Sequence, residues 1–392
     1  MEDQTGVFKE MFRRNMRQYT MIAALVVIWI FFAVMTDGTF TSPRNLSNLF
    51  LQTVTVAIVA CGMVLIIVTN NIDLSVGSVA GFCGAVGAVL QVKYGWDTPY
   101  TILAVLITGL IIGAWHGFWV AWKKVPAFIV TLASMLAFRG AILGVTGGAT
   151  ISPMRDSFKE IGSGYIPDLF TPKGGFNDTS AFLAIIGIIL FVLFEVRQRK
   201  KRAEHGFQQN PLWMDAGRIV ILSLAIAGVF SIMIFNEGIP YAVVILLVVV
   251  LLFRFIGERT VFGRRLYAIG GNADAAMLSG ISIQKNIMAL YMIFGSLTAL
   301  AGVVMTARLN AATTSAGMNM ELDAIAAAVI GGTSLMGGEG KITGAVIGAL
   351  IMSSLDNGMS LMNIDITYQY IIKGLILLTA VWADISMRKR RG

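Results

Sequence analysis

The sequence predicts an all-α fold: a polytopic membrane helical bundle of about 10–12 transmembrane helices with broken or re-entrant segments. Apolar residues make up 56% of the 392 positions, and the mean hydropathy is +0.76. Charged residues make up only 13%, roughly half the share that is typical of soluble domains. Apolar runs of about the length that crosses the hydrocarbon recur along the chain. The chain is therefore expected to be an integral membrane protein.

The apolar runs follow one another without a linker that would separate domains, so residues 1–392 are expected to form a single transmembrane domain. The first run follows a basic stretch and has no small-residue cleavage motif after it, which predicts an uncleaved helix. A few runs are short enough to be re-entrant half-spans. We place the spans at roughly 20–36, 51–69, 76–92, 101–120, 126–147, 181–196, 217–235, 239–257, 286–306, 322–334, 342–357 and 366–384.

The net charge of +8 follows the expected topology. Lysine and arginine are concentrated in alternate loops, such as Lys123–Lys124 and the segment 197–218, and they are sparse in the loops between. Under the positive-inside rule, this asymmetry predicts a multi-pass protein with both termini in the cytoplasm. The excess of basic residues is therefore explained by the topology of the chain in a lipid membrane, and no nucleic-acid partner is needed to explain it.

No residue pattern predicts catalysis or metal binding. Cys61 and Cys83 lie in predicted spans at no metal or redox spacing. His116 stands among tryptophans near the inner end of a span, where anchoring at the membrane interface explains it. The stretch "GGEGKIT" (337–343) departs from the phosphate-binding loop, because Ile342 follows the lysine where a hydroxyl would hold Mg²⁺. We expect no catalytic residue, no metal and no cofactor in this chain.

A short helix is expected in the centre of the inner loop 258–285. Asn272 is a good N-cap residue, Asp274 suits the positive end of the helix dipole, and Gly280 suits the C-terminal stop. A helix of about eight residues is too short to be stable alone in water. It therefore needs a surface to pack on.

The apolar residues Met277 and Leu278 bear on what that surface is. If they are exposed at the inner face of the membrane, they favour a partner protein. Packing of the helix on the chain's own bundle is an equal alternative.

Several stretches resemble bacterial sugar ABC-importer permeases of the ribose/xylose/galactose permease family, in order from about residue 45 to 384. The segment from about 180 to 235 adds two spans that shorter, ribose-type members lack, so the chain looks most like the xylose or multiple-monosaccharide permeases. The matching stretches are "GMVLIIVTNNIDLSVGS" (62–78), "VPAFIVTLASMLAFRG" (125–140), "GRRLYAIGGNADAAMLSGI" (263–281), "ELDAIAAAVIGGTSLMGGEG" (321–340) and "YQYIIKGLILLTAVWAD" (368–384).

The resemblance implies a type II ABC-importer permease-like fold and a transport function. The chain would be the permease subunit of an ATP-binding-cassette importer in the bacterial cell inner membrane. It would move a monosaccharide, with xylose the first choice and arabinose, glucose and galactose open. It would be a transport subunit and not an enzyme, because ATP and Mg would be bound on a separate partner ATPase. An extracytoplasmic (periplasmic) sugar-binding protein and a second permease copy, forming a homodimer, would complete the system.

The resemblance also assigns a role to the short inner helix, as the coupling helix on which the cytoplasmic ATPase docks. Its residues are Gly271, Asn272, Ala273, Asp274, Ala275, Ala276, Met277, Leu278, Ser279 and Gly280.

The polar break "NNIDLSVGS" (70–78) has two interpretations. In one, Asp73 caps the helix that follows, since Asp-Leu-Ser is good N-terminal chemistry. A neutral sugar needs hydrogen-bonding groups but no fixed charge, which favours this capping role. In the other, the polar residues line or gate the sugar path. The residues of that path would be Asn70, Asn71, Asp73, Ser75 and Asp323.

Other charged residues also fall inside predicted spans, where they need partners. Glu321 and Asp323 begin the short run at 322–334, at the positive end of a predicted half-helix. Arg139 is the expected partner of one of these acids. Asp356 is expected to face either the mouth of the dimer or the lipid headgroups.

An ion-coupled secondary sugar transporter is the alternative function, because such transporters also contain broken helices. That class would not need the docking element between Asn272 and Gly280.

Overall fold

The computed structural model describes residues 20–169, 176–206, 211–235 and 237–389. Within these residues, nine helices are long and apolar enough to cross a membrane, and shorter apolar helices cover Thr20–Met35 and Ile366–Trp382. The predicted all-α membrane bundle is confirmed. The two termini lie outside the described residues, so their cytoplasmic placement stays a prediction.

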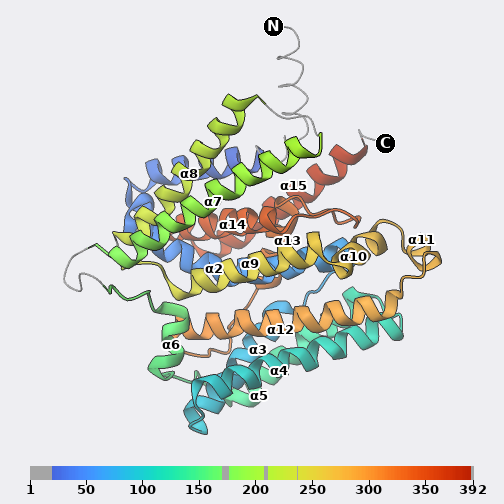
Figure 1. Ribbon diagram of the computed structural model, residues 1–392. Helices are drawn as coiled ribbons and strands as arrows, with labels where there is room; N and C mark the ends of the chain where they lie inside the picture. Colours follow the sequence, from blue (N-terminus) through green and yellow to red (C-terminus); the bar gives the residue numbers. More distant parts are fainter. Residues whose placement is uncertain (1–19, 170–175, 207–210, 236, 390–392) are drawn as a thin grey trace.

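The helices after Thr20–Met35 follow the expected order along the chain (Figure 1). Short π-helical turns at Val89–Lys93 and Phe118–Trp122 extend α3 and α4. The bounds are α2 Pro43–Val68, α3 Val76–Ala88, α4 Thr98–Gly117, α5 Ala127–Thr146, α6 Asp156–Ser163, α7 Asp178–Glu204, α8 Leu212–Ile234, α9 Tyr241–Arg259, α10 Val261–Gly271, α11 Ala273–Leu278, α12 Ile283–Leu309, α13 Met320–Ile330, α14 Ile342–Leu361 and α15 Ile366–Lys389.

Helix α2 is the centre of the bundle. Its most apolar stretch is 89% buried, and it packs against α9, α12, α13 and α14. A helix that is apolar on every side can be covered by lipid or by other helices. The run from Val54 to Val68 is covered almost entirely by other parts of the chain. The remaining spans are arranged around this helix.

Small residues set the close helix contacts. A Cβ on Gly113 of α4 would lie 2.1 Å from the carbonyl oxygen of Tyr291, and one on Gly348 of α14 would lie 2.1 Å from that of Ala327. The stripe Gly140–Gly144 on α5 behaves differently, since no atom of the described chain lies within 4 Å of either added Cβ. That stripe therefore makes no close backbone contact within the described chain.

Two chain breaks interrupt the bundle. The first separates α2 from α3, and the second separates α13 from α14. Helix α13 has 11 residues, which at 1.5 Å per residue span about 16 Å, roughly half of the hydrocarbon thickness. Its length is that of the predicted half-span.

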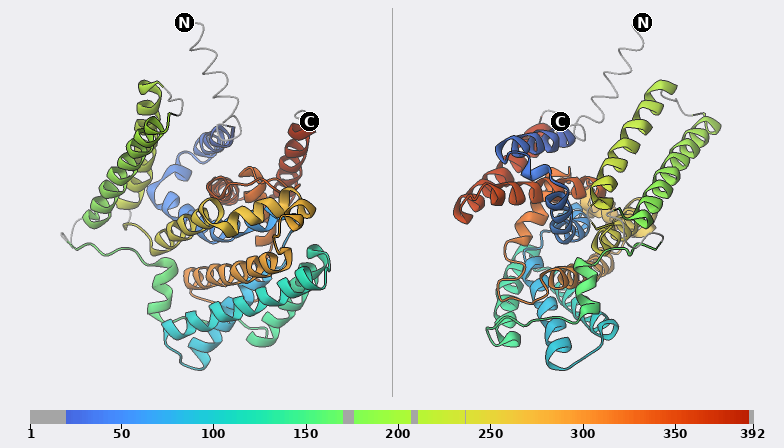
Figure 2. Two further views of the ribbon diagram at one scale, coloured as in Figure 1. Left: turned by 45° about the vertical axis from the view of Figure 1, so that its right-hand side comes forward. Right: turned by 90° about the vertical axis from the view of Figure 1, so that its left-hand side faces the viewer.

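The two-span addition predicted at about 180–235 forms the helical pair α7 and α8. Figure 2 shows this pair standing at one side of the bundle. Its apolar stretches are only 17% and 11% buried within the chain. Arg218 contacts Glu195 at 3.2 Å and Arg199 pairs with Asp215, so ion pairs join the two helices beyond their apolar part.

Candidate functional site: an inner junction and an outer cavity

The bundle has two chemically different ends. Helix α11 lies at one end and α6 at the other (Figure 1). We call these the inner end and the outer end, following the topology that the positive-inside rule predicts. Helices α2 and α14 run between the two ends. Val68, the last residue of α2, and Ile342, the first residue of α14, lie toward the inner end.

The predicted short helix is present at the inner end as α11. The Asn272 side chain accepts a hydrogen bond from the amide of Ala275 at 2.9 Å, which is the expected N-cap. Gly280 has a φ of +79°, the left-handed conformation that stops a helix. The local chemistry of the sequence therefore specifies this element.

One face of α11 packs on the chain and the other does not. Ala276 is 4% exposed, whereas Met277 is 57% exposed and Leu278 is 87% exposed. Ala276 therefore packs on the chain's own bundle, whereas the two larger apolar side chains remain uncovered by the described chain, and a partner for them stays a prediction.

Three backbone segments meet beside α11 with no space for side chains. The amide of Gly338 donates to the carbonyl oxygen of Val68 at 2.9 Å. A Cβ on Gly270, at the end of α10, would lie 1.6 Å from that same oxygen. The end of α2, the end of α10 and the second chain break are therefore in direct contact. We call this contact the inner junction, made by Val68, Asn70, Gly270, Gly337 and Gly338.

Asn70 completes the inner junction. Its φ of +60° is a conformation that asparagine tolerates better than most residues. Its side-chain nitrogen approaches the carbonyl oxygen of Gly270 at 3.4 Å. A Cβ on Gly337 would lie 2.5 Å from its side-chain oxygen. Asn71 instead bonds locally, to the carbonyl and hydroxyl oxygens of Thr69.

Tyr267 adds a second connection between α10 and the second break. Its hydroxyl donates to the carbonyl oxygen of Gly340 at 2.8 Å. Burial raises the pKa of Tyr267 to about 12. The phenol therefore stays protonated at neutral pH and can act as the donor.

Asp73 stabilises the start of α3, but from a position different from the one predicted. The N-cap residue is Ser75, and its side chain makes no cap bond. The Oδ1 of Asp73 accepts from the Ser75 amide at 2.8 Å and from its hydroxyl at 2.6 Å. Asp73 thus orders the turn two residues before the helix and does not cap α3 directly.

His116 is not an interface anchor, which corrects the interpretation of the tryptophan-rich segment. It is 2% exposed, while the neighbouring Trp115 is 54% exposed. Its Nδ1 lies 3.8 Å from the Oδ2 of Asp73, and its ring meets that of Tyr291 edge to face. The buried carboxylate faces His116 and does not open onto either cavity described below.

A polar cavity of about 270 Å³ lies next to the first turn of α13, on the side that faces the outer end of the bundle. Thr55 lies on the outer half of α2, Arg308 in the last turn of α12, and Asp323 in the first turn of α13. We call this space the outer cavity. It is lined by Gln52, Thr55, Val56, Met305, Arg308, Gly317, Met318, Met320, Asp323, Ser353 and Asp356.

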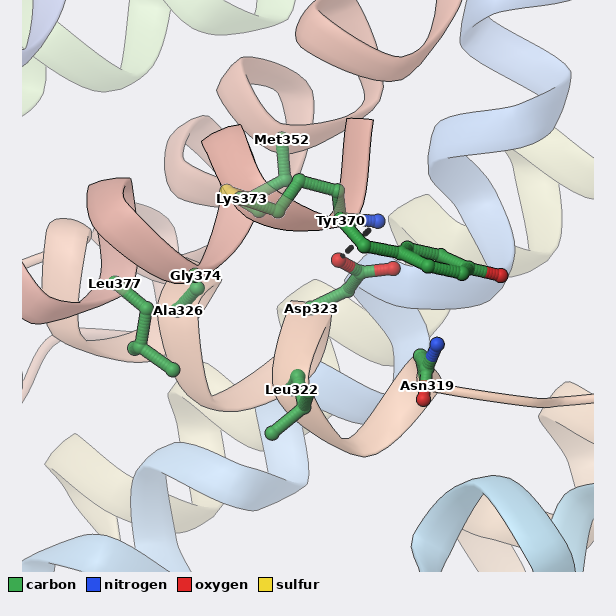
Figure 3. A pocket seen from close by; sticks show the side chains of 9 residues that line it. All are labelled: Asn319, Leu322, Asp323, Ala326, Met352, Tyr370, Lys373, Gly374 and Leu377. Atoms are coloured by element: carbon green, nitrogen blue, oxygen red, sulfur yellow. Dashed lines mark ion pairs between the residues drawn. The ribbon is translucent and has the colours of Figure 1, made fainter. Parts of the chain in front are cut away.

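Lys373 of α15 joins two acids that line the outer cavity. Its Nζ lies 2.7 Å from Oδ1 of Asp323 and 3.1 Å from Oδ2 of Asp356. Figure 3 shows Lys373 reaching Asp323 in a smaller adjoining pocket, with Tyr370 beside them. A charge within the membrane needs such a partner, because an isolated one costs about 2.5–3.5 kcal/mol on insertion scales.

This ion pair bears on two expectations. Of the two acids expected for Arg139, Asp323 is excluded, whereas Glu321 interacts with Arg139 electrostatically. The guanidinium also donates to the carbonyl oxygen of Ala316 at 2.8 Å. Asp356 bonds to Lys373 inside the chain, so it does not simply face headgroups. Lys373 could have been identified from sequence, since it is a lone lysine in the apolar run "YIIKGLILL".

The predicted path residues therefore do not form one site. Asn70 belongs to the inner junction, Asn71 bonds beside it, and Asp73 and Ser75 form a buried turn. Only Asp323 lines the outer cavity. The sequence analysis missed its other polar lining residues, Gln52, Thr55, Arg308 and Ser353, because isolated polar residues on apolar helices carry no motif.

No described group of three or more His, Cys, Asp or Glu side chains could hold a metal ion. Cys61 and Cys83 are both buried and unpaired among the described residues.

Comparison with known proteins gives consistent matches over nearly the whole chain. Residues 45–381 match the model of the family described as "Branched-chain amino acid transport system / permease component". The chain is 45% identical over 386 residues to the xylose transport system permease protein XylH of Escherichia coli (strain K12), covering 98% of this chain and 96% of that protein.

Two further relatives are similar over comparable lengths. XylH of Haemophilus influenzae is 45% identical over 376 residues, covering 96% of this chain and 98% of the relative. The ribose import permease protein RbsC of Escherichia coli (strain K12) is 36% identical over 369 residues, covering 94% of each chain. No solved structure matches the chain.

Proposed function

This chain belongs to the family of transport-system permease components that its residues 45–381 match, and from that premise we propose that it imports a monosaccharide as the membrane subunit of an ATP-driven importer. Xylose is the first choice of substrate, because the relatives at 45% identity are named for xylose transport. The family description names branched-chain amino acids, whereas the relatives reported above, matched over nearly the whole chain, are named for xylose and ribose transport. Arabinose, glucose and galactose remain alternatives.

The observation that carries this proposal is the exposure of α11. Met277 and Leu278 are uncovered on a short capped helix, although a helix of six residues has little stability of its own. Its direct connection to the inner junction gives a docked protein a mechanical route to α2 and to the second chain break. A separate cytoplasmic ATPase, which binds ATP and Mg, fits this surface by function and position.

The remaining parts of the system follow from import in this direction. An extracytoplasmic sugar-binding protein would release sugar at the outer end, where the outer cavity lies. A second copy of this chain would complete a homodimer in the cell inner membrane. ATP binding and hydrolysis would then favour different states of the bundle in turn, as alternating access requires.

Reconstitution of the permease with its ATPase and binding protein in proteoliposomes tests the proposal. Uptake of radiolabelled D-xylose is expected to require ATP on the ATPase side and to persist when ionophores remove ion gradients. Accumulation driven by an ion gradient without ATP would instead establish the secondary-transporter alternative. The same assay with labelled arabinose, glucose and galactose ranks the substrates.

A further inference from the structure

The outer cavity has the chemistry of a ligand site whose residues have no assigned role. We propose that it is the seat in which this chain itself holds a neutral pentose during transport. Thr55 and Arg308 would be its principal hydrogen-bonding residues. This inference rests on the proposed import of sugar and adds the residues that contact the substrate inside the membrane.

The size and position of the outer cavity suit this role. A cavity of about 270 Å³ is far larger than the roughly 10–15 Å³ that one water needs, so it has room for a single small ring such as a pentose. The cavity lies against the N-terminal turn of α13, where Met320 and Asp323 line it. A solute entering from the outer end would reach it before the inner junction.

Two polar atoms in the outer cavity lack partners within the described chain. The Oγ1 of Thr55 and the Nε of Arg308 are buried and make no hydrogen bond there. Thr55 is only 5% exposed. Leaving a buried donor or acceptor unpaired is costly, so such groups are usually satisfied by something else. A ligand with several hydroxyl groups can satisfy both atoms at once.

The charges around the outer cavity favour a neutral ligand. Lys373 contacts Asp323 and Asp356, which leaves about one unit of negative charge on that group. The guanidinium of Arg308 offsets it. With the local charge close to zero, neither an anion nor a cation would be favoured.

The uncharged lining residues match the two surfaces of a sugar. Gln52 and Ser353 add an amide and a hydroxyl, which can donate and accept as sugar hydroxyls do. Met305, Met318 and Met320 offer an adaptable apolar surface to the C–H face of the ring.

The first test compares two threonines on α2. Thr55→Val removes a hydroxyl that has no partner in the described chain, so thermal stability should be unchanged or slightly higher. ATP-driven uptake of D-xylose in the complete reconstituted importer should nevertheless fall about two- to tenfold, the usual effect of one lost hydrogen bond. Thr53→Val is the matched control, because Thr53 does not line the outer cavity and bonds to the carbonyl oxygen of Leu49. Its uptake should match the unaltered importer.

Deoxy analogues separate direct contact from a structural effect. One of 2-, 3- or 4-deoxyxylose lacks the sugar hydroxyl that bonds to Thr55. The unaltered importer should therefore transport that analogue less well than xylose. Thr55→Val should remove that discrimination for one analogue and leave it for the others. A uniform loss across xylose and all three analogues would overturn the assignment of Thr55.

A labelling experiment tests the seat in the permease alone. In a variant with Cys61→Ala and Cys83→Ala, Ser353→Cys places one thiol at the outer cavity. Added D-xylose should slow alkylation of this thiol by N-ethylmaleimide, and mannitol at the same concentration should not. If ATP-driven uptake fails but xylose protects the thiol, the proposed function is wrong and the seat stands. If uptake succeeds while Thr55→Val transports normally and xylose gives no protection, the seat is overturned.

Discussion

The amide of Gly338 donates to the carbonyl oxygen of Val68 at 2.9 Å, and this bond joins the two chain breaks of the bundle. Val68 ends the central helix α2, and Gly338 lies in the loop between α13 and α14. The end of α10 packs against the same carbonyl and leads directly into the exposed helix α11. A force applied to α11 therefore reaches both interrupted segments within a few residues.

The first prediction concerns the space at the inner junction. Gly270→Ala would put a Cβ 1.6 Å from the carbonyl oxygen of Val68, so the backbones must separate. We expect a lower melting temperature in detergent and a loss of ATP-driven uptake per folded molecule.

Gly271→Ala is the control for this prediction. A Cβ added at Gly271 would have no atom within 4 Å. That substitution should leave transport unchanged and should not reduce stability. Equal effects of the two alanines would refute the close backbone contact.

The second prediction separates the two roles considered for Asp73. Asp73→Ala removes the acceptor for the Ser75 amide and should lower stability by about 1–3 kcal/mol. Asp73→Asn keeps an acceptor oxygen and should cost less. Both are measured by unfolding in mixed micelles. If the asparagine variant folds normally but binds or transports sugar poorly, the carboxylate acts on the sugar path and not in the turn.

The third prediction concerns the buried ion pair. Lys373→Met leaves Asp323 without its 2.7 Å partner and should destabilise the protein by about 3–5 kcal/mol. Adding Asp323→Asn to that variant should recover part of the loss, because Asp323 is then neutral while Asp356 still lacks its lysine partner. Unfolding in mixed micelles measures both variants. No recovery in the double variant would contradict a stabilising charge pairing between Lys373 and Asp323.

Features with local causes could be predicted from the sequence. The apolar runs gave the spans, and Asn272 and Gly280 gave the ends of α11, because a cap and a left-handed stop depend on adjacent residues. The half-helix α13 was also predicted, from its length and from the acids at its start.

Features that depend on pairing across the bundle could not be predicted. Lys373 is 50 residues after Asp323 in the chain, and His116 is 43 residues after Asp73, so nothing in the sequence indicates which charge meets which. The outer cavity could not be predicted for the same reason, since residues of α2, α12, α13 and α14 line it together. The contact of Asn70 with Gly270 likewise appears only when the helices are packed.

The exposed face of α11 provides the most direct measurement. Met277→Asp with Leu278→Asp changes only side chains that are 57% and 87% exposed, so the chain should still insert and fold. Ser279→Ala, at the residue that follows α11, is the control. Co-purification of the ATPase and ATP-driven uptake of D-xylose should both be lost in the double variant and retained in the control. Normal co-purification and uptake in the double variant would contradict energisation through α11.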